Sequence, residues 1–99
     1  MVSKSFPTFN NIIADFEFTP LNASTLNPYI DFVNHSINGS IYYWDFGDSS
    51  FTTLENPTHE FQNSGIYNVT LVVSDTNQCI DSVQHDVIVY YEYILYMPS

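Results

Sequence analysis

Two aspartates beside a cluster of aromatic residues are the first candidates for chemistry in this chain. In "YYWDFGDSS", residues 42–50, Asp45 and Asp48 lie three positions apart. Two carboxylates can act as general acid and general base where a groove separates them and one pKa is raised. The sequence contains no sign of such a groove, and aspartate commonly accepts backbone N–H bonds in turns. We therefore expect structural aspartates and no catalytic residue.

Calcium coordination is the alternative role for these carboxylates. Calcium takes oxygen ligands from loops, and four oxygen-bearing residues lie in or next to predicted turns: Asp45, Asp48, Asp75 and Asn77. The chain has 11 acidic residues against one Lys or Arg, a net charge of −10 that would attract cations. A solvated acidic surface explains the same charge without a metal. Calcium is the only cofactor that the sequence suggests.

Other catalytic or metal-binding combinations are missing from the sequence. His35, His59 and His85 lie on separate segments with no zinc spacing, and we expect His59 to bond to nearby backbone within "NPTHEF". No serine lies in a G-x-S-x-G elbow. Cys79 is the single cysteine, which excludes an intramolecular disulfide and a CxxC motif. The sequence therefore predicts a protein that is not an enzyme.

The charge also restricts the partners. Lys4 is the only basic residue besides histidine, whereas nucleic acids and anionic membranes are bound through Lys and Arg. No apolar run approaches the roughly 18 residues of a membrane span, and "MVSKSF" lacks the apolar core of a signal peptide. We expect no nucleic acid, no membrane insertion, and an export signal, if one exists, outside this segment.

The elements that must position these residues are strands. Val, Ile, Thr, Tyr and Phe are abundant, no apolar run has helical spacing, and short alternating runs are separated by Asn, Pro, Gly and Ser clusters. Runs spaced about ten residues apart are typical of a sandwich or barrel. The length of 99 residues suits one domain. The chain is predicted to be all-β.

The period of two assigns the core positions of the clearest strands. "SIYYWDFG" and "GIYNVTLVVSD" place on their inward faces Tyr42, Trp44, Phe46, Tyr67, Val69, Leu71 and Val73. The stretch "DSSFTTLENPTH" is expected to be a long connection or a weak edge strand, because Pro57 lacks a ladder donor.

Some tyrosines must face solvent. Tyr42, Tyr43, Tyr90, Tyr91 and Tyr93 cannot all point inward. Exposed rings could stack on sugar rings, fill a protein interface or pair across strands. The sequence leaves open which of them are outward.

Four segments together resemble the PKD domain, a β-sandwich module. "YYWDFGDSS", "ENPTHEF", "GIYNVTLVVSD" and "CIDSV" are similar to that family's W-D-F-G-D-G, N-P-x-H-x-[YF] and G-x-Y-x-V-x-L-x-V motifs over roughly residues 14–90. The resemblance implies an immunoglobulin-like sandwich of two antiparallel sheets with about seven strands. Its implied core motif is Trp44, Phe46, Gly47, Pro57, His59 and Tyr67. Ser49 replaces a usual glycine, and Phe61 a commoner tyrosine.

The resemblance also implies an organisation and a role. The chain looks most like PKD modules of secreted Bacteroidetes surface proteins, including gliding-motility-associated ones. Residues 1–13 would be an extension or linker, 14–90 the PKD domain, and 91–99 a linker strand toward a further domain or an ordinary terminal strand. We expect a non-catalytic spacer, adhesion or protein-interaction unit, secreted or at the cell surface. Its partners would be other domains of the chain, a surface protein or polysaccharide. The alternative is a polysaccharide-binding accessory module using exposed tyrosines.

Overall fold

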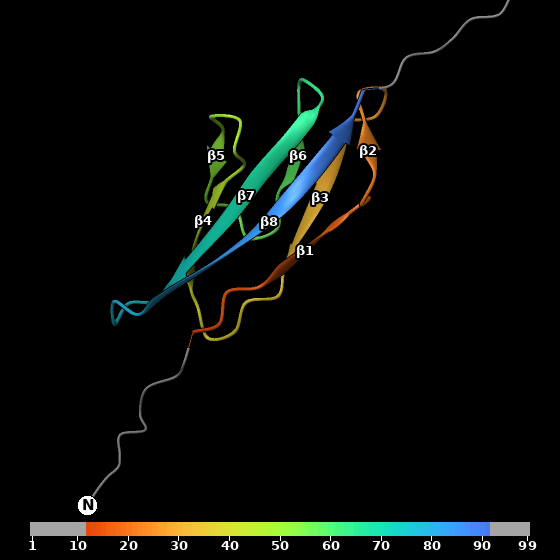
Figure 1. The fold of residues 1–99 in the computed structure, drawn as a ribbon. Coiled ribbons are helices and arrows are strands. Elements are labelled where there is room, and N and C mark those ends of the chain that lie inside the picture. The colour runs from red at the N-terminus through yellow and green to blue at the C-terminus, as the bar shows by residue number, and fades with distance from the viewer. Residues whose placement is uncertain (1–11, 92–99) are drawn as a thin grey trace, which may run out of the picture.

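A computed structural model describes residues 12–91 as eight strands in two packed sheets (Figure 1). The strands are β1 (Phe16–Thr19), β2 (Ala23–Ser24), β3 (Tyr29–Asn34), β4 (Ile41–Asp45), β5 (Phe51–Thr52), β6 (Thr58–Glu60), β7 (Gly65–Ser74) and β8 (Ile80–Tyr90). One sheet has the order β1-β3-β6 and the other β2-β8-β7-β4-β5. Within residues 12–91, no helix is long and apolar enough to cross a membrane. The predicted all-β sandwich is confirmed, and most of both predicted terminal segments lies outside the described residues.

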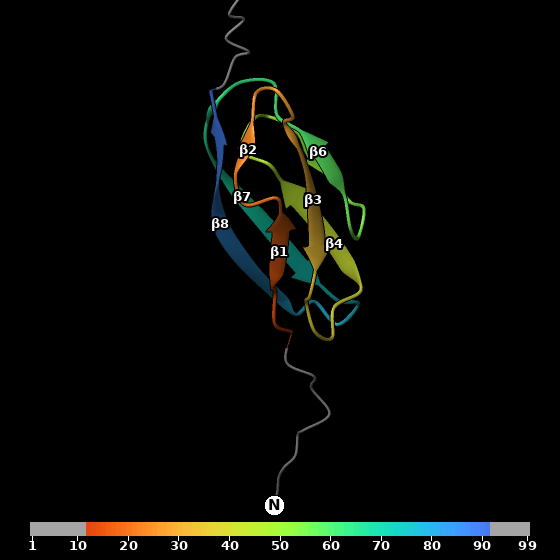
Figure 2. The ribbon, with the colours of Figure 1, turned by 90° about the vertical axis from the view of Figure 1, so that its right-hand side faces the viewer.

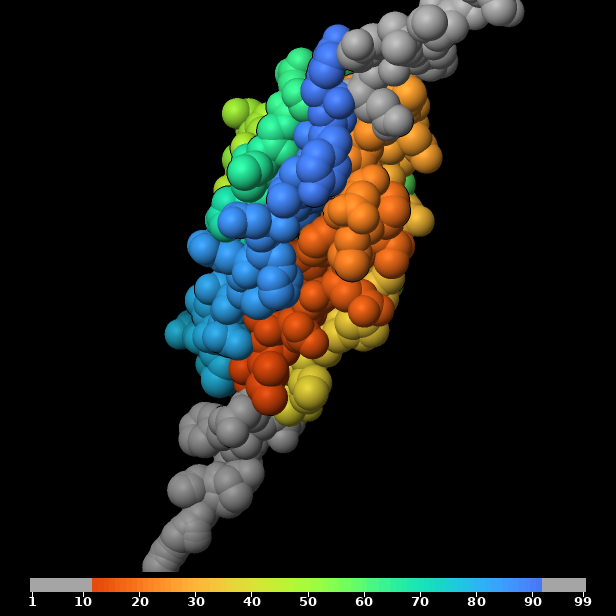
Figure 3. Space-filling view, turned by 45° about the vertical axis from the view of Figure 1, so that its right-hand side comes forward, coloured from red at the N-terminus to blue at the C-terminus, as the bar shows by residue number. Residues whose placement is uncertain are grey.

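All strand pairs are antiparallel except one. β2 runs parallel to the end of β8, with Ala23 opposite Val89 and Ser24 opposite Tyr90. β1 belongs to the smaller sheet, and the chain passes to the larger sheet after Pro20. In the space-filling view the orange β1–β2 segment lies along the blue β8 (Figure 3). The sheets are antiparallel as expected apart from β2, because the first segment changes sheets without reversing direction.

The stretch predicted as a connection or a weak edge strand contains two short strands. β5 pairs with the end of β4, and β6 pairs with β3 in the other sheet, so the chain crosses between sheets here. Pro57 lies directly before β6, where its missing N–H removes no ladder bond, and its carbonyl accepts the Phe32 N–H at 2.9 Å. The proline is buried and tolerated at an edge.

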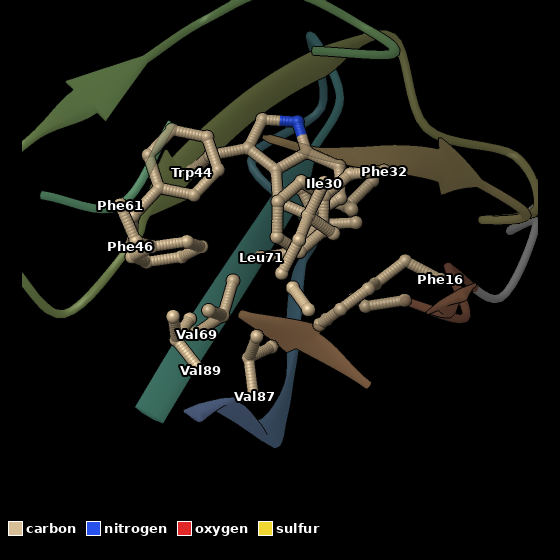
Figure 4. Close-up of a cluster of buried hydrophobic side chains, with 13 residues drawn as sticks. Phe16, Ile30, Phe32, Trp44, Phe46, Phe61, Val69, Leu71, Val87 and Val89 are labelled. Carbon is tan, nitrogen blue, oxygen red and sulfur yellow. The ribbon is translucent and has the colours of Figure 1, made fainter. Parts of the chain in front are cut away.

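The core fills the space between the two sheets (Figure 4). Its buried members are Ala14, Phe16, Ala23, Ile30, Phe32, Trp44, Phe46, Phe61, Val69, Leu71, Val73, Val87 and Val89. Trp44 is fully buried, its ring centroid lies 4.9 Å from that of Phe16, and its indole N–H donates to the Leu54 carbonyl at 2.9 Å. Tyr42 and Tyr67 face inward but are only half-buried, because their hydroxyls reach the carbonyls of Gly39 and Asn63 at the margin.

The chain enters and leaves the sandwich at opposite ends (Figures 1 and 2). At the entry, the Ala14 N–H donates to Asp81 Oδ2 at 2.9 Å, near the start of β8. At the exit, Tyr90 ends β8 and its carbonyl accepts the Thr25 N–H at 2.9 Å. A strand rises about 3.4 Å per residue, so the distance along β8 from Asp81 to Tyr90 is about 30 Å.

Candidate functional site

Asp45 and Asp48 both bind backbone in the turn that follows β4. Asp45 Oδ1 accepts the Gly47 N–H at 2.9 Å, and Asp48 Oδ1 accepts the Ser50 N–H at 3.1 Å. Gly47 has a φ of 80°, and a Cβ there would lie 2.7 Å from the Asn68 carbonyl oxygen. Ser49, which stands where the PKD-like motif usually has glycine, also has a positive φ of 73°. The turn therefore holds both carboxylates by local bonds.

Asp48 makes a second contact that the sequence analysis did not predict. Its Oδ2 lies 2.7 Å from His59 Nε2, and each side chain is 16% exposed. A carboxylate can only accept, so the ring nitrogen facing Asp48 is protonated. The expectation that His59 bonds to nearby backbone is wrong, because β6 presents this side chain on its inner face, opposite Ile30. From there it reaches the β4–β5 turn of the other sheet.

The pair lowers the pKa of Asp48. Partial burial acts to raise this pKa, but the hydrogen bond from His59, the charge of that imidazole and the hydrogen bonds from Ser50 outweigh burial. The pKa of the Asp48 carboxyl is therefore held below its usual value. The ionised carboxylate is the favoured partner for His59.

Aromatic rings hold the imidazole in place. The His59 ring is stacked on Phe46, with centroids 4.1 Å apart and planes within 3° of parallel, and it meets Phe61 edge-on at 4.6 Å. Figure 4 shows Phe46 and Phe61 together on one side of the core, near Trp44. The Asp48–His59 pair thus joins the two sheets along one lateral edge of the sandwich.

A pocket of about 580 Å³ opens beside the pair. It is lined by Asp48, Ser49, Ser50, His59, Glu60, Gln62, Asn63 and Tyr67. Every lining side chain carries a hydrogen-bonding group, and Tyr67 adds an aromatic ring. The signal in the sequence was the "NPTHEF" motif followed by polar residues, but only folding brings it to the β4–β5 turn. We refer to this hollow as the edge pocket.

The other two predicted calcium ligands lie in the β7–β8 turn. Asp75 Oδ1 accepts the N–H groups of Asn77 at 2.8 Å and Cys79 at 3.1 Å, so it closes this hairpin. Here too the aspartate of a turn accepts hydrogen bonds from backbone N–H groups.

The strand register separates the two turns. β4 and β7 are antiparallel, with Ile41 opposite Ser74 and Asp45 opposite Thr70. The β4–β5 turn and the β7–β8 turn therefore lie beyond opposite ends of β4, so the structure does not bring the four predicted ligands into one group. In the part of the chain that the structure describes, no three His, Cys, Asp or Glu residues are grouped so that they could hold a metal ion.

The structure also shows which tyrosines face solvent. Tyr43 is 42% exposed on the outer face of the five-stranded sheet, where its ring is stacked on Phe51 at 5.7 Å. Tyr29, Tyr90 and Tyr91 are exposed elsewhere, and Tyr93 lies outside the described residues. Phe51 reaches Tyr43 because β5 pairs with β4 in a register that places Phe51 opposite Asp45.

Comparison with known proteins places curated relatives, including the following two, among bacterial collagenases. The chain is 39% identical over 54 residues to a microbial collagenase of Vibrio alginolyticus, which is 52% of this chain and 7% of that protein. It is 38% identical over 61 residues to a collagenase of Bacillus cereus, which is 50% of this chain and 6% of that protein. The chain therefore spans less than a tenth of the length of each relative.

Solved structures share the fold. One, described as concerning the promiscuous specificity of carbohydrate-binding modules from the β-sandwich superfamily, superposes with a TM-score of 0.74 at 31% identity, over 83% of this chain and 35% of that one. The PKD1 domain of a Vibrio cholerae metalloprotease superposes with a TM-score of 0.69 at 29% identity, over 82% and 99%. The family model of the PKD domain matches residues 13–90. Motifs, sandwich and family match agree, and the chain belongs to the PKD domain family.

Proposed function

We propose that this PKD domain is a non-catalytic spacer in a larger extracellular protein. The observation that carries the proposal is the position of the chain ends, at opposite poles of a sandwich about 30 Å long. A module of this kind adds its own length between its two neighbours. Its partners are then the neighbouring domains of the same protein, one before residue 14 and one after residue 90.

The comparisons support a modular role. The matched region is a small part of each collagenase, so in those proteins the bulk of the chain lies in other domains. The motifs further resemble those of bacterial surface proteins. We propose that the parent protein is secreted or displayed at the cell surface and that the module separates or presents an adhesive or binding domain. A gliding-motility-associated parent of Bacteroidetes type fits this placement.

The spacer role can be tested by inserting the full 99-residue chain between two globular reporter domains. Small-angle X-ray scattering should show the centres of the reporters about 30 Å further apart than in a direct fusion, with a narrow distance distribution. A Gly/Ser linker of equal length is the control and should give a broad distribution. An unchanged separation, or a distribution as broad as that of the control, would exclude a rigid spacer.

Polysaccharide binding is the second candidate function. It is favoured by the stacked pair Tyr43 and Phe51, two exposed aromatic side chains in contact on the outer face of the five-stranded sheet. The similarity to a structure described as a carbohydrate-binding module supports it. A glycan array tests the candidate: binding should be lost in Tyr43→Ala/Phe51→Ala and kept in Tyr29→Ala, an exposed tyrosine of the other sheet. If the unmodified chain binds no glycan on the array, polysaccharide binding by this surface is excluded and the spacer role remains.

A further inference from the structure

We propose that the edge pocket binds one neutral, hydroxyl-rich group, a single sugar residue, at a site distinct from the Tyr43–Phe51 surface. This inference goes beyond the spacer role and does not depend on it. The pocket lies on the lateral edge between β6 and the β4–β5 turn, whereas Tyr43 and Phe51 lie on the outer sheet face.

The wall of the edge pocket is held rigidly. His59 is fixed by Phe46 on one face, Phe61 at its edge and Asp48 at Nε2. The Tyr67 ring packs on Phe61 with centroids 4.4 Å apart, and its hydroxyl donates to the Asn63 carbonyl. A pocket whose wall is already ordered loses little entropy when a ligand binds.

The charge of the edge pocket excludes anions. Asp48 and Glu60 both line it, and residues 12–91 contain no Lys or Arg. A carboxylate, phosphate or sulfate group would meet two carboxylates, and the imidazole of His59, the one group of the pocket that can carry positive charge, is already paired with Asp48. An apolar ligand fits poorly as well, because it would desolvate polar side chains without offering them hydrogen bonds.

The free side chains of the pocket match hydroxyl groups. Ser49 offers a hydroxyl, and Gln62 and Asn63 offer amides, so each can both donate and accept. A sugar hydroxyl also does both. An ammonium group donates hydrogen bonds but accepts none, so it would pair with Glu60 and could not use the amide N–H groups of the pocket. The Tyr67 ring can meet the apolar C–H face of a sugar ring.

The size of the edge pocket suits a small ligand. Its volume of about 580 Å³ falls within the range of roughly 300–1,000 Å³ found for small-molecule sites. A free sugar and the terminal residue of a glycan share the required chemistry. The two sources differ in whether neighbouring sugar residues add affinity.

Amide chemical shifts of the isotope-labelled 99-residue chain test the proposal. The probes are neutral monosaccharides, their oligosaccharides, glucuronate and free lysine. A neutral sugar should shift the amides of Ser49, Gln62 and Asn63, and glucuronate should not. An oligosaccharide that binds more tightly than its monosaccharide identifies a glycan end as the source; equal affinities identify a free sugar.

Three variants sharpen the test. Gln62→Ala should weaken sugar binding about five- to tenfold, the effect of one lost hydrogen bond. Gln84→Ala, the same substitution on the exposed outer face of β8, is the matched control and should leave sugar binding unchanged. Glu60→Gln removes the free charge but keeps the hydrogen-bonding atoms, so it should leave sugar binding nearly intact.

Three results would overturn the proposal. The first is that no sugar of the panel shifts the pocket amides. The second is that lysine shifts them and Glu60→Gln abolishes that shift, which would identify a cation site. The third is that sugars shift only Tyr43 and Phe51, which would exclude the edge pocket while leaving the second candidate function in place.

Discussion

At the scale of single residues, the Asp48–His59 contact is the feature with the clearest energetic consequence. Asp48→Asn keeps the shape of the side chain but removes its charge, and we expect it to lower the free energy of unfolding by about 1–2 kcal/mol. Asp45→Asn is the matched control, because its carboxylate bonds only to the exposed turn at Gly47, and its loss should be smaller. Urea denaturation of both variants measures the difference. Equal losses would show that the His59 contact contributes nothing.

The lowered pKa of Asp48 predicts a pH dependence for the same contact. A carboxyl whose folded pKa is depressed stabilises the fold above its unfolded pKa of about 3.9, and this contribution is lost as the pH falls through the lower folded pKa. The stability gap between the unmodified protein and Asp48→Asn should therefore narrow as the pH falls below about 4. Urea titrations at a series of pH values measure it. A gap that stays constant down to about pH 2 would contradict the assignment.

Ser49 carries a backbone cost that a single substitution can remove. Its φ of 73° lies in the left-handed region, which disfavours residues with a Cβ. Ser49→Gly should raise the free energy of unfolding by up to about 1 kcal/mol, the strain relieved less the extra entropy of glycine in the unfolded chain. Thermal unfolding checks the sign. Gly47→Ala, in the same turn, should have the opposite effect, because its Cβ would clash with the Asn68 carbonyl.

At the scale of elements, the two faces of β4 contribute very differently to the stability of the fold. Trp44 is fully buried between the sheets, whereas its neighbour Tyr43 is half in solvent on the outer face. Trp44→Ala should lower the free energy of unfolding by about 3–5 kcal/mol, through lost contacts and a cavity. Tyr43→Ala should cost less than about 1 kcal/mol, since the side chain lies at the surface and packs on Phe51 there. Chemical denaturation of the two variants tests the assignment of faces, and similar losses would show it to be wrong.

At the scale of the whole molecule, acidic charge is the dominant property. Ten net negative charges repel one another in the folded state, and the only Lys lies outside the described residues. Added salt should therefore raise the melting temperature. This effect is nonspecific and should be the same for calcium and magnesium at equal ionic strength.

Calcium binding stays a prediction at this scale. A loop site with a dissociation constant of about 10⁻⁴–10⁻³ M would add about 1 kcal/mol in millimolar calcium, or about 4–8 °C in melting temperature, beyond the effect of magnesium. The two turns are far apart, so Asp48→Asn and Asp75→Asn test them separately. The calcium-induced rise in melting temperature should disappear only in the variant whose turn binds calcium. Equal shifts with the two ions would exclude a specific site.

Local features of this chain could be predicted from its sequence. The alternation along β7, and along β4 and the residue that follows it, places Trp44, Phe46, Val69 and Leu71 inward because successive side chains of a strand point to opposite faces. The turn aspartates bond to N–H groups two residues ahead, a contact that needs no other part of the chain. These interactions act over a few residues, so the local sequence determines them. The sandwich architecture was predicted from the resemblance to the PKD motifs.

Contacts between distant segments depended on the tertiary structure. Asp48 meets His59 only because β6 joins one sheet while the β4–β5 turn belongs to the other. The same packing forms the edge pocket, and the register of β4 with β7 sends the predicted calcium ligands to opposite ends. Turn signals and alternation show where a strand begins and which way a side chain points, but they do not say which strand lies beside it. The pairing of strands is determined by burial of the whole core, and this pairing decides which polar residues form a site.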